Sequence, residues 1–283
     1  MNQTIRLLGF LLMALSMSCT KDAEIDLPEY KPTLVIHSYI SPLDSQVVVY
    51  VNLSKSAYSN NSYAMNNVKD ATVKISDGLV TKTLNFFPVL FSDEISYYYI
   101  DSTELKITVG KTYNLLVTTP DGKVATATTT IPTAVALKSI ESNLVSSLFG
   151  DSVYKMNFTF QDPIGQEDYY KYAAYVILKD TVLDSLVSWS GNEGMATYLG
   201  SDGNLISETM EVYRSFNFIN PEEVPSIDFR LMHVTREFYL YHQSIQKFGG
   251  GPFAEPNVPF TNIHGGVGVF AGFNEEQQMI RLK

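Results

Sequence analysis

Short apolar runs separated by turn residues occupy residues 33–131 and predict strands rather than helices. In the run at residues 46–53, Val47, Val49 and Val51 recur at every second position, so they share one face of a strand. Asp77-Gly78 is a hairpin turn signal. Strands are expected at residues 33–40, 46–53, 71–76, 79–91, 97–100, 112–118 and 124–131. This spacing predicts an antiparallel, immunoglobulin-like β-sandwich over residues 33–134.

The rest of the chain predicts a second β-rich domain over residues 135–283. Strands are expected at residues 137–140, 153–160, 169–178, 210–218 and 226–233, whereas residues 179–204 give no clear pattern. Residues 235–248 predict a helix, because Phe238, Tyr241 and Ile245 form a stripe after Thr235, a suitable N-cap. Glycines end this helix, and a further strand is expected to start at Gly266.

The first residues have the pattern of a secretory signal peptide that ends at a lipidated cysteine. Arg6 precedes an apolar run at residues 7–15, which is too short to span a bilayer as a helix. Cys19, the single cysteine of the chain, then stands where a bacterial lipoprotein carries its acyl chains. We therefore expect a signal peptide at residues 1–18 and an acylated cysteine with a polar tether at residues 19–32. The alternatives are a soluble secreted protein and a short N-terminal membrane helix.

The composition limits which kinds of partner the protein can bind and which interactions can stabilise it. The chain has 283 residues and a net charge of −10, which argues against binding to nucleic acid or to anionic lipid by charge. Hydrophobic residues make up 45%, enough for a core. With Cys19 acylated no thiol remains for a disulfide, so packing must supply the stability.

Candidate chemistry is sparse, and we expect no catalytic residue, no metal site and no cofactor. His37, His233, His242 and His264 do not pair at metal-ligand spacing. The Gly265-Gly266-Val267-Gly268 run precedes an expected strand rather than a helix, so it indicates close backbone packing of a strand under the helix instead of phosphate binding.

Aromatic residues supply the candidate contact surface. Tyr97, Tyr99 and Tyr170 lie in tyrosine-rich strands whose alternate rings face outward, and His264 lies between the helix and the last strand. We expect these four residues to contact a glycan, a peptide or a partner protein. The alternative is that the rings pack the sandwich cores.

Four stretches of the chain carry a resemblance to a known family: Cys19 with residues 25–30; residues 34–54; residues 110–113 with 121–122; and residues 237–241 with 252–256 and 262–273. In these the chain resembles the Bacteroidota envelope lipoproteins called domain of unknown function 4249. Lys21, Asp22 and Glu24 resemble the acidic signal that sends such lipoproteins to the cell surface. The resemblance implies a largely β, two-part outer-membrane lipoprotein, often encoded beside a TonB-dependent receptor, and it brings no catalytic motif.

These observations together predict a mainly β, non-enzymatic lipoprotein that is anchored in the outer membrane, exposed at the cell surface, and an accessory binding subunit of a TonB-dependent nutrient uptake system. A structural or adhesive surface lipoprotein is the first alternative. The second is a hydrolase on a β-scaffold, which would need His264 or His233 beside a serine and a carboxylate.

Overall fold

The computed structural model describes residues 30–56, 66–88, 96–148, 151–165, 167–180, 185–198, 203–214, 226–246 and 258–281. The chain divides into two units, Met1–Lys31 and Pro32–Lys283, and all the strands below belong to the second. Within these residues, no helix has the length and apolar character needed to cross a bilayer. The predicted lipidation and export residues Cys19, Lys21, Asp22 and Glu24 lie outside the described residues.

The first part of the second unit is a sandwich of two sheets. One layer contains β1 (Leu34–Ile40), β2 (Gln46–Leu53), β6 (Ser96–Asp101) and β5 (Asn85–Pro88), and the other contains β4 (Thr81–Thr83), β3 (Thr72–Ser76), β7 (Thr112–Thr118) and β8 (Val124–Thr130). Alternate residues of both layers are fully buried between them, such as Val49 of β2 and Val117 of β7. The period-two pattern of the sequence therefore forms the core.

The second part repeats this arrangement with longer strands. One sheet is ordered β13 (Leu205–Arg214), β10 (Asp151–Gln161) and β9 (Leu137–Leu148), and the facing layer is ordered β12 (Ser185–Tyr198), β11 (Asp168–Asp180), β14 (Ser226–Val234) and β15 (Gly266–Arg281). Aromatic rings fill the space between the layers: Phe158 of β10 lies 4.7 Å from Phe229 of β14. Trp189, in the stretch that had no clear pattern, belongs to β12.

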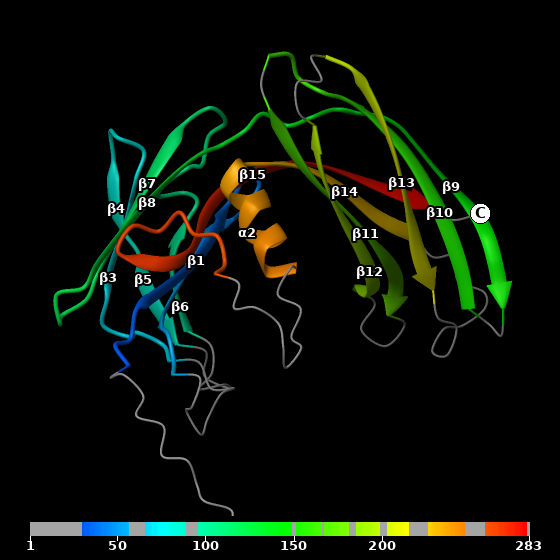
Figure 1. Cartoon of the computed structure of the whole chain (residues 1–283). Coiled ribbons are helices and arrows are strands. Elements are labelled where there is room, and N and C mark those ends of the chain that lie inside the picture. Colours follow the sequence, from blue (N-terminus) through cyan, green and yellow to red (C-terminus); the bar gives the residue numbers. More distant parts are fainter. Residues whose placement is uncertain are drawn as a thin grey trace, which may run out of the picture. The chain divides into compact units, whose positions relative to one another are not determined.

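The last strand, β15, takes part in both sandwiches (Figure 1). Its first half pairs in parallel with β1, from Leu34 opposite Gly266 to Ile40 opposite Gly272. Its second half pairs antiparallel with β14, starting with Val234 opposite Phe273. Residues 33–134 and 135–283 thus share one continuous sheet, and their separation into two domains stays a prediction.

Two glycines of β15 allow this strand to lie where it does. An added Cβ at Gly268, whose φ is +115°, would stand 2.0 Å from the carbonyl oxygen of Ile36 on β1. At Gly272 the nearest atom to such a Cβ would be Ile131 Cδ1, at 2.9 Å. The sequence predicted close backbone packing for Gly265, Gly266 and Gly268, and this is confirmed: an added Cβ at each would stand 2.2, 2.8 and 2.0 Å from a backbone oxygen.

Helix α2 (Arg236–Gln246) covers the side of β15 that faces away from the first sandwich core. Phe238 and Tyr241 are buried against Val269 and Ala271 of the strand. Thr235 begins the helix, since its Oγ1 accepts a bond from the Phe238 N–H at 3.4 Å. The helix predicted at residues 235–248 is therefore confirmed, with bounds within two residues of those expected.

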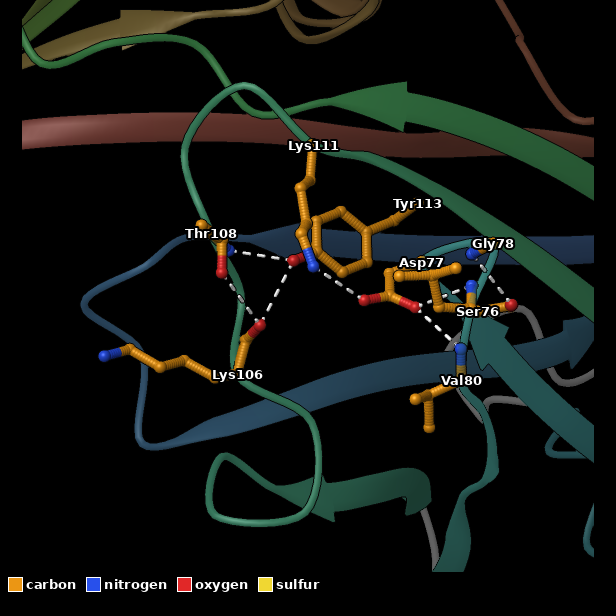
Figure 2. A network of polar contacts seen from close by, with 9 residues as sticks. Ser76, Asp77, Gly78, Val80, Lys106, Thr108, Lys111 and Tyr113 are labelled. Carbon is orange, nitrogen blue, oxygen red and sulfur yellow. Dashed lines mark hydrogen bonds and ion pairs between the residues drawn. The ribbon is translucent and has the colours of Figure 1, made fainter.

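Polar contacts fix the turns at one end of the first sandwich (Figure 2). The buried Tyr113 donates its hydroxyl to the Lys106 carbonyl at 3.1 Å and accepts from the Thr108 N–H at 2.8 Å. A tyrosine that bonds back to the backbone a few residues upstream is a hallmark of immunoglobulin-like sandwiches. The mainly β, immunoglobulin-like fold class is confirmed by the sheets and by this corner.

Beside this corner, the Asp77 carboxylate closes the β3–β4 turn. It accepts from the N–H groups of Val80 at 2.8 Å and Leu79 at 3.1 Å, and pairs with Lys111 Nζ at 2.9 Å. The Val80 N–H and the Lys111 ammonium, with the Leu79 N–H, lower the pKa of Asp77 to about 2 from an ordinary 3.8. The Asp77-Gly78 turn that the sequence predicts is thereby confirmed.

We expect Gly268→Ala to lower the free energy of unfolding by about 3 kcal/mol or more, because the new methyl group meets the β1 backbone and the residue has positive φ. Gly122→Ala is the matched control: its φ is +87°, but nothing lies within 4 Å of an added Cβ, so it should cost about 1 kcal/mol. Urea unfolding of the two variants measures the difference, and equal losses would contradict the steric role of Gly268.

The Asp77 turn predicts a pH-dependent contribution to stability. Because folding lowers this pKa, the contribution is complete above pH 4 and is lost as pH falls toward 2. The unfolding temperature of the wild type should exceed that of Asp77→Asn at pH 6, and the gap should close by pH 2. Lys138→Gln changes an exposed lysine outside this turn and is the control; a gap between the wild type and Asp77→Asn that stays constant over this pH range would contradict the turn's role.

Candidate functional site

Four aromatic side chains on the outer side of the first sandwich, Tyr50, Phe87, Tyr97 and Tyr99, form a cluster that we call the aromatic face. Tyr97 is central: its ring lies 5.4 Å from Phe87, 5.9 Å from Tyr50 and 6.2 Å from Tyr99. Phe87 and Tyr97 stack at an interplanar angle of 26°, and the other two contacts are edge-on. Tyr50 and Phe87 are 38% and 43% exposed, so the cluster reaches solvent.

Strand register brings these rings together from three strands. Tyr97 lies opposite Phe87 of β5, and the pair Tyr99 and Val48 joins β6 to β2. The intervening residue, Tyr98, points inward, is 2% exposed and donates its hydroxyl to the Val68 carbonyl. The Tyr97-Tyr98-Tyr99 run is thus divided by the pleat into two outward rings and one core ring.

Helix α2 covers the neighbouring part of the same sheet side. Tyr39 of β1 packs 4.9 Å from Phe238, and His37 hydrogen-bonds the Tyr241 hydroxyl. Burial lowers the pKa of His37, which favours its neutral ring in this contact. The aromatic face begins one strand further on, since Tyr50 lies opposite His37 in the β1–β2 register.

The other two predicted contact residues lie elsewhere. Tyr170 is fully buried in the second sandwich, and its hydroxyl donates to the Asp162 carboxylate at 2.6 Å. The prediction that Tyr170 faces a ligand or partner is therefore wrong, because the β11 pleat turns its ring into the core. His264 is exposed, and its backbone exchanges two hydrogen bonds with Thr126 of β8; its predicted contact stays a prediction.

A cavity of about 410 Å³ lies where the β8–β9 connection meets the start of α2. Its lining residues are Thr130, Ile131, Pro132, Thr133, Glu167, Asp168, Tyr169, His233, Val234, Thr235 and Arg236. The side chains of His233 and Asp168 are 4% and 1% exposed there, and Nε2 of the histidine lies 2.8 Å from Oδ1 of the carboxylate. Nδ1 lies 2.8 Å from the Thr133 carbonyl, so both ring nitrogens are engaged.

This arrangement determines what His233 can do. The Thr133 carbonyl can only accept, so Nδ1 donates to it, and Nε2 is held against the Asp168 carboxylate. The ring therefore keeps no free lone pair with which to take a proton from a nucleophile. In the described residues, moreover, no three His, Cys, Asp or Glu side chains gather at a distance suited to a metal ion.

Sequence reasoning predicted Tyr97 and Tyr99 as contact residues but missed Tyr50 and Phe87. The alternation of inward and outward residues along each strand could have revealed both residues. Tyr50 follows the buried Val49 in β2, and Phe87 follows the inward Phe86 in β5, so both rings face outward. The pairing of β5 and β2 with β6 is what converts four separate residues into one surface.

The fold and the aromatic face define a mainly β protein whose two sandwiches share a strand. A family model described as "Domain of unknown function (DUF4249)" matches residues 20–279, and the chain belongs to this family. The resemblance to domain of unknown function 4249 is thus confirmed, whereas the Bacteroidota origin and the lipoprotein character stay predictions. No curated protein matches the chain.

Solved structures give only distant similarities. A cytokine receptor complex is 11% identical, with a TM-score of 0.24, over 72% of this chain and 92% of that one. The FN1–FN3 domains of chicken CNTN1 are 9% identical, with a TM-score of 0.24, over 87% of this chain and 68% of that one. Similarities of this size carry no argument about function.

The pair of His233 and Asp168 predicts a large effect on stability. His233→Phe keeps a ring that can stack on Tyr170 but leaves the buried carboxylate without its imidazole, so we expect unfolding to become easier by about 3–5 kcal/mol. Asp168→Asn is the control: its amide can donate to Nε2, and the loss should be less than half as large. Urea denaturation measures both, and an unchanged midpoint for His233→Phe would show that the pair contributes nothing.

Proposed function

We propose that this protein is a lipid-anchored outer-membrane lipoprotein that binds a ligand for a TonB-dependent uptake system without catalysing a reaction. The aromatic face is the observation that carries the binding role. It lies on regular strands and is exposed, whereas most large apolar side chains of the strands are buried. An exposed aromatic cluster of this kind is typical of an interaction site.

The anchor and the partner rest on other grounds. Cys19 follows a signal-like segment, and Lys21, Asp22 and Glu24 follow Cys19, which supports acylation and export to the cell surface. The partnership with a TonB-dependent receptor rests on the family resemblance. The non-enzymatic assignment is supported by His233, whose ring nitrogens both serve structural hydrogen bonds.

A structural or adhesive surface lipoprotein is the second candidate. Exposed rings on an otherwise regular sheet favour it, because adhesion needs a surface rather than a cavity. The two functions differ in their partner: an uptake subunit stays associated with an outer-membrane barrel, whereas an adhesin does not require one.

Cys19→Ala should abolish incorporation of labelled palmitate and release the protein from the membrane fraction, because acyl chains supply the anchoring free energy. Met17→Ala leaves the thiol in place and is the control. In detergent extracts, affinity purification of the wild type should recover an outer-membrane barrel protein. Unchanged labelling of Cys19→Ala contradicts the anchor, and purification without any barrel protein contradicts the uptake role.

A further inference from the structure

We propose that the aromatic face binds an uncharged carbohydrate, which rests on the binding role proposed above and names its class of ligand. Three observations on the face itself carry this step: the absence of charge among its outward residues, the polar groups between its rings, and its small area.

Along β2, β5 and β6, the outward-facing residues are uncharged until the end of β6. Beside the rings they carry Val48 and Asn85, and the first charged outward residue of β6 is Asp101, at the strand's far end. The whole chain holds 50 charged residues, 20 basic and 30 acidic, so the lack of charge at these outward positions of the described strands is distinctive. A charged ligand would lose its hydration at this surface without gaining a counter-charge.

Polar groups lie among the rings rather than only around them. Asn85 is exposed and lies opposite Tyr99 in the β5–β6 register, and three of the four rings are tyrosines that carry a hydroxyl. A sugar ring presents apolar C–H groups on its face and hydroxyls at its edge. Tyrosine faces match the apolar part of such a ring, and the tyrosine hydroxyls with the Asn85 amide match its edge.

The area of the face argues against a large protein partner. An aromatic side chain presents roughly 150–250 Å² in all, so two rings at 38% and 43% exposure and two half-buried rings offer roughly 300 Å². A stable protein–protein interface needs about 800 Å² on each partner. The face is therefore too small for such an interface and suits a chain of a few sugar rings.

The adjacent sheet edge argues against a peptide that adds as a strand. β5 ends the sheet order at this side, but its four residues finish at Pro88, which has no N–H to donate. Short edge strands that contain proline are a common protection against strand addition. A glycan lying across the rings needs no backbone hydrogen bonds from this edge.

The test is titration calorimetry of the full chain in lauryldimethylamine oxide, a detergent without a sugar headgroup. Cellohexaose, maltohexaose and chitohexaose are the neutral probes, and hexagalacturonic acid is the charged one. We expect at least one neutral hexasaccharide to bind, and the charged one to bind at least tenfold more weakly. Binding should weaken tenfold or more in Tyr97→Ala and in Phe87→Ala.

Matched variants separate stacking from folding. Tyr97→Phe keeps the ring and should stay within threefold of the wild type, and Tyr50→Ala tests the face from a different strand. Val124→Ala, at a residue 51% exposed on β8, removes an exposed apolar side chain outside the face and should change nothing. Thermal unfolding of each variant checks that the sandwich is intact.

Three results would overturn the proposal: no binding of any neutral hexasaccharide, equal or tighter binding of the charged one, or neutral binding that survives Tyr97→Ala and Phe87→Ala in folded protein. The affinity purification described above is a separate readout. If the protein recovers a barrel protein but binds no hexasaccharide, the carbohydrate proposal is refuted and the proposed uptake role stands. If the protein binds a hexasaccharide through this face but recovers no barrel protein, the carbohydrate proposal is supported and the proposed uptake role is refuted.

Discussion

The pairing of β15 with both β1 and β14 is the constraint on which the rest of the second unit depends. One strand must lie in parallel beside the first strand of the chain and then continue antiparallel beside β14. The change of partner falls at Gly272, whose N–H donates to Thr129 Oγ1 and whose carbonyl accepts from the Thr235 N–H. These hydrogen bonds connect Gly272 to β8 and to the residue that begins α2. The strand therefore holds β8 and α2 in place at this one residue.

This shared strand also explains where the exposed rings lie. β15 is buried on both sides, with Phe270 in the first sandwich core and Val269 and Ala271 under α2. Helix α2 lies over β15, β11 and β1, where it meets His37 and Tyr39, rather than over β2, β6 and β5. The outer side of those three strands therefore keeps its aromatic residues in contact with solvent.

Local patterns in the sequence predict most of the elements, since alternation and turn residues act over a few positions. The strand at Gly266 and the helix after Thr235 follow from such patterns. Local patterns do not determine which distant strands pair. The parallel pairing of β1 with β15 therefore could not be predicted from the sequence. The same limit explains Tyr170: alternation shows that neighbours face opposite ways, but only the packing of Phe160 against it shows which side is the core.

The candidate site illustrates the same division between local and long-range information. Tyr97 and Tyr99 are recognisable from their own strand, whereas Tyr50 and Phe87 join them only through strand register. Two of the four histidines that sequence reasoning weighed hold the fold: His233 bonds the β8–β9 connection, and His37 bonds Tyr241 of α2. The fold thus uses these two imidazoles as structural ties and leaves the rings of the aromatic face in contact with solvent, which supports the proposed role in recognition by stacking.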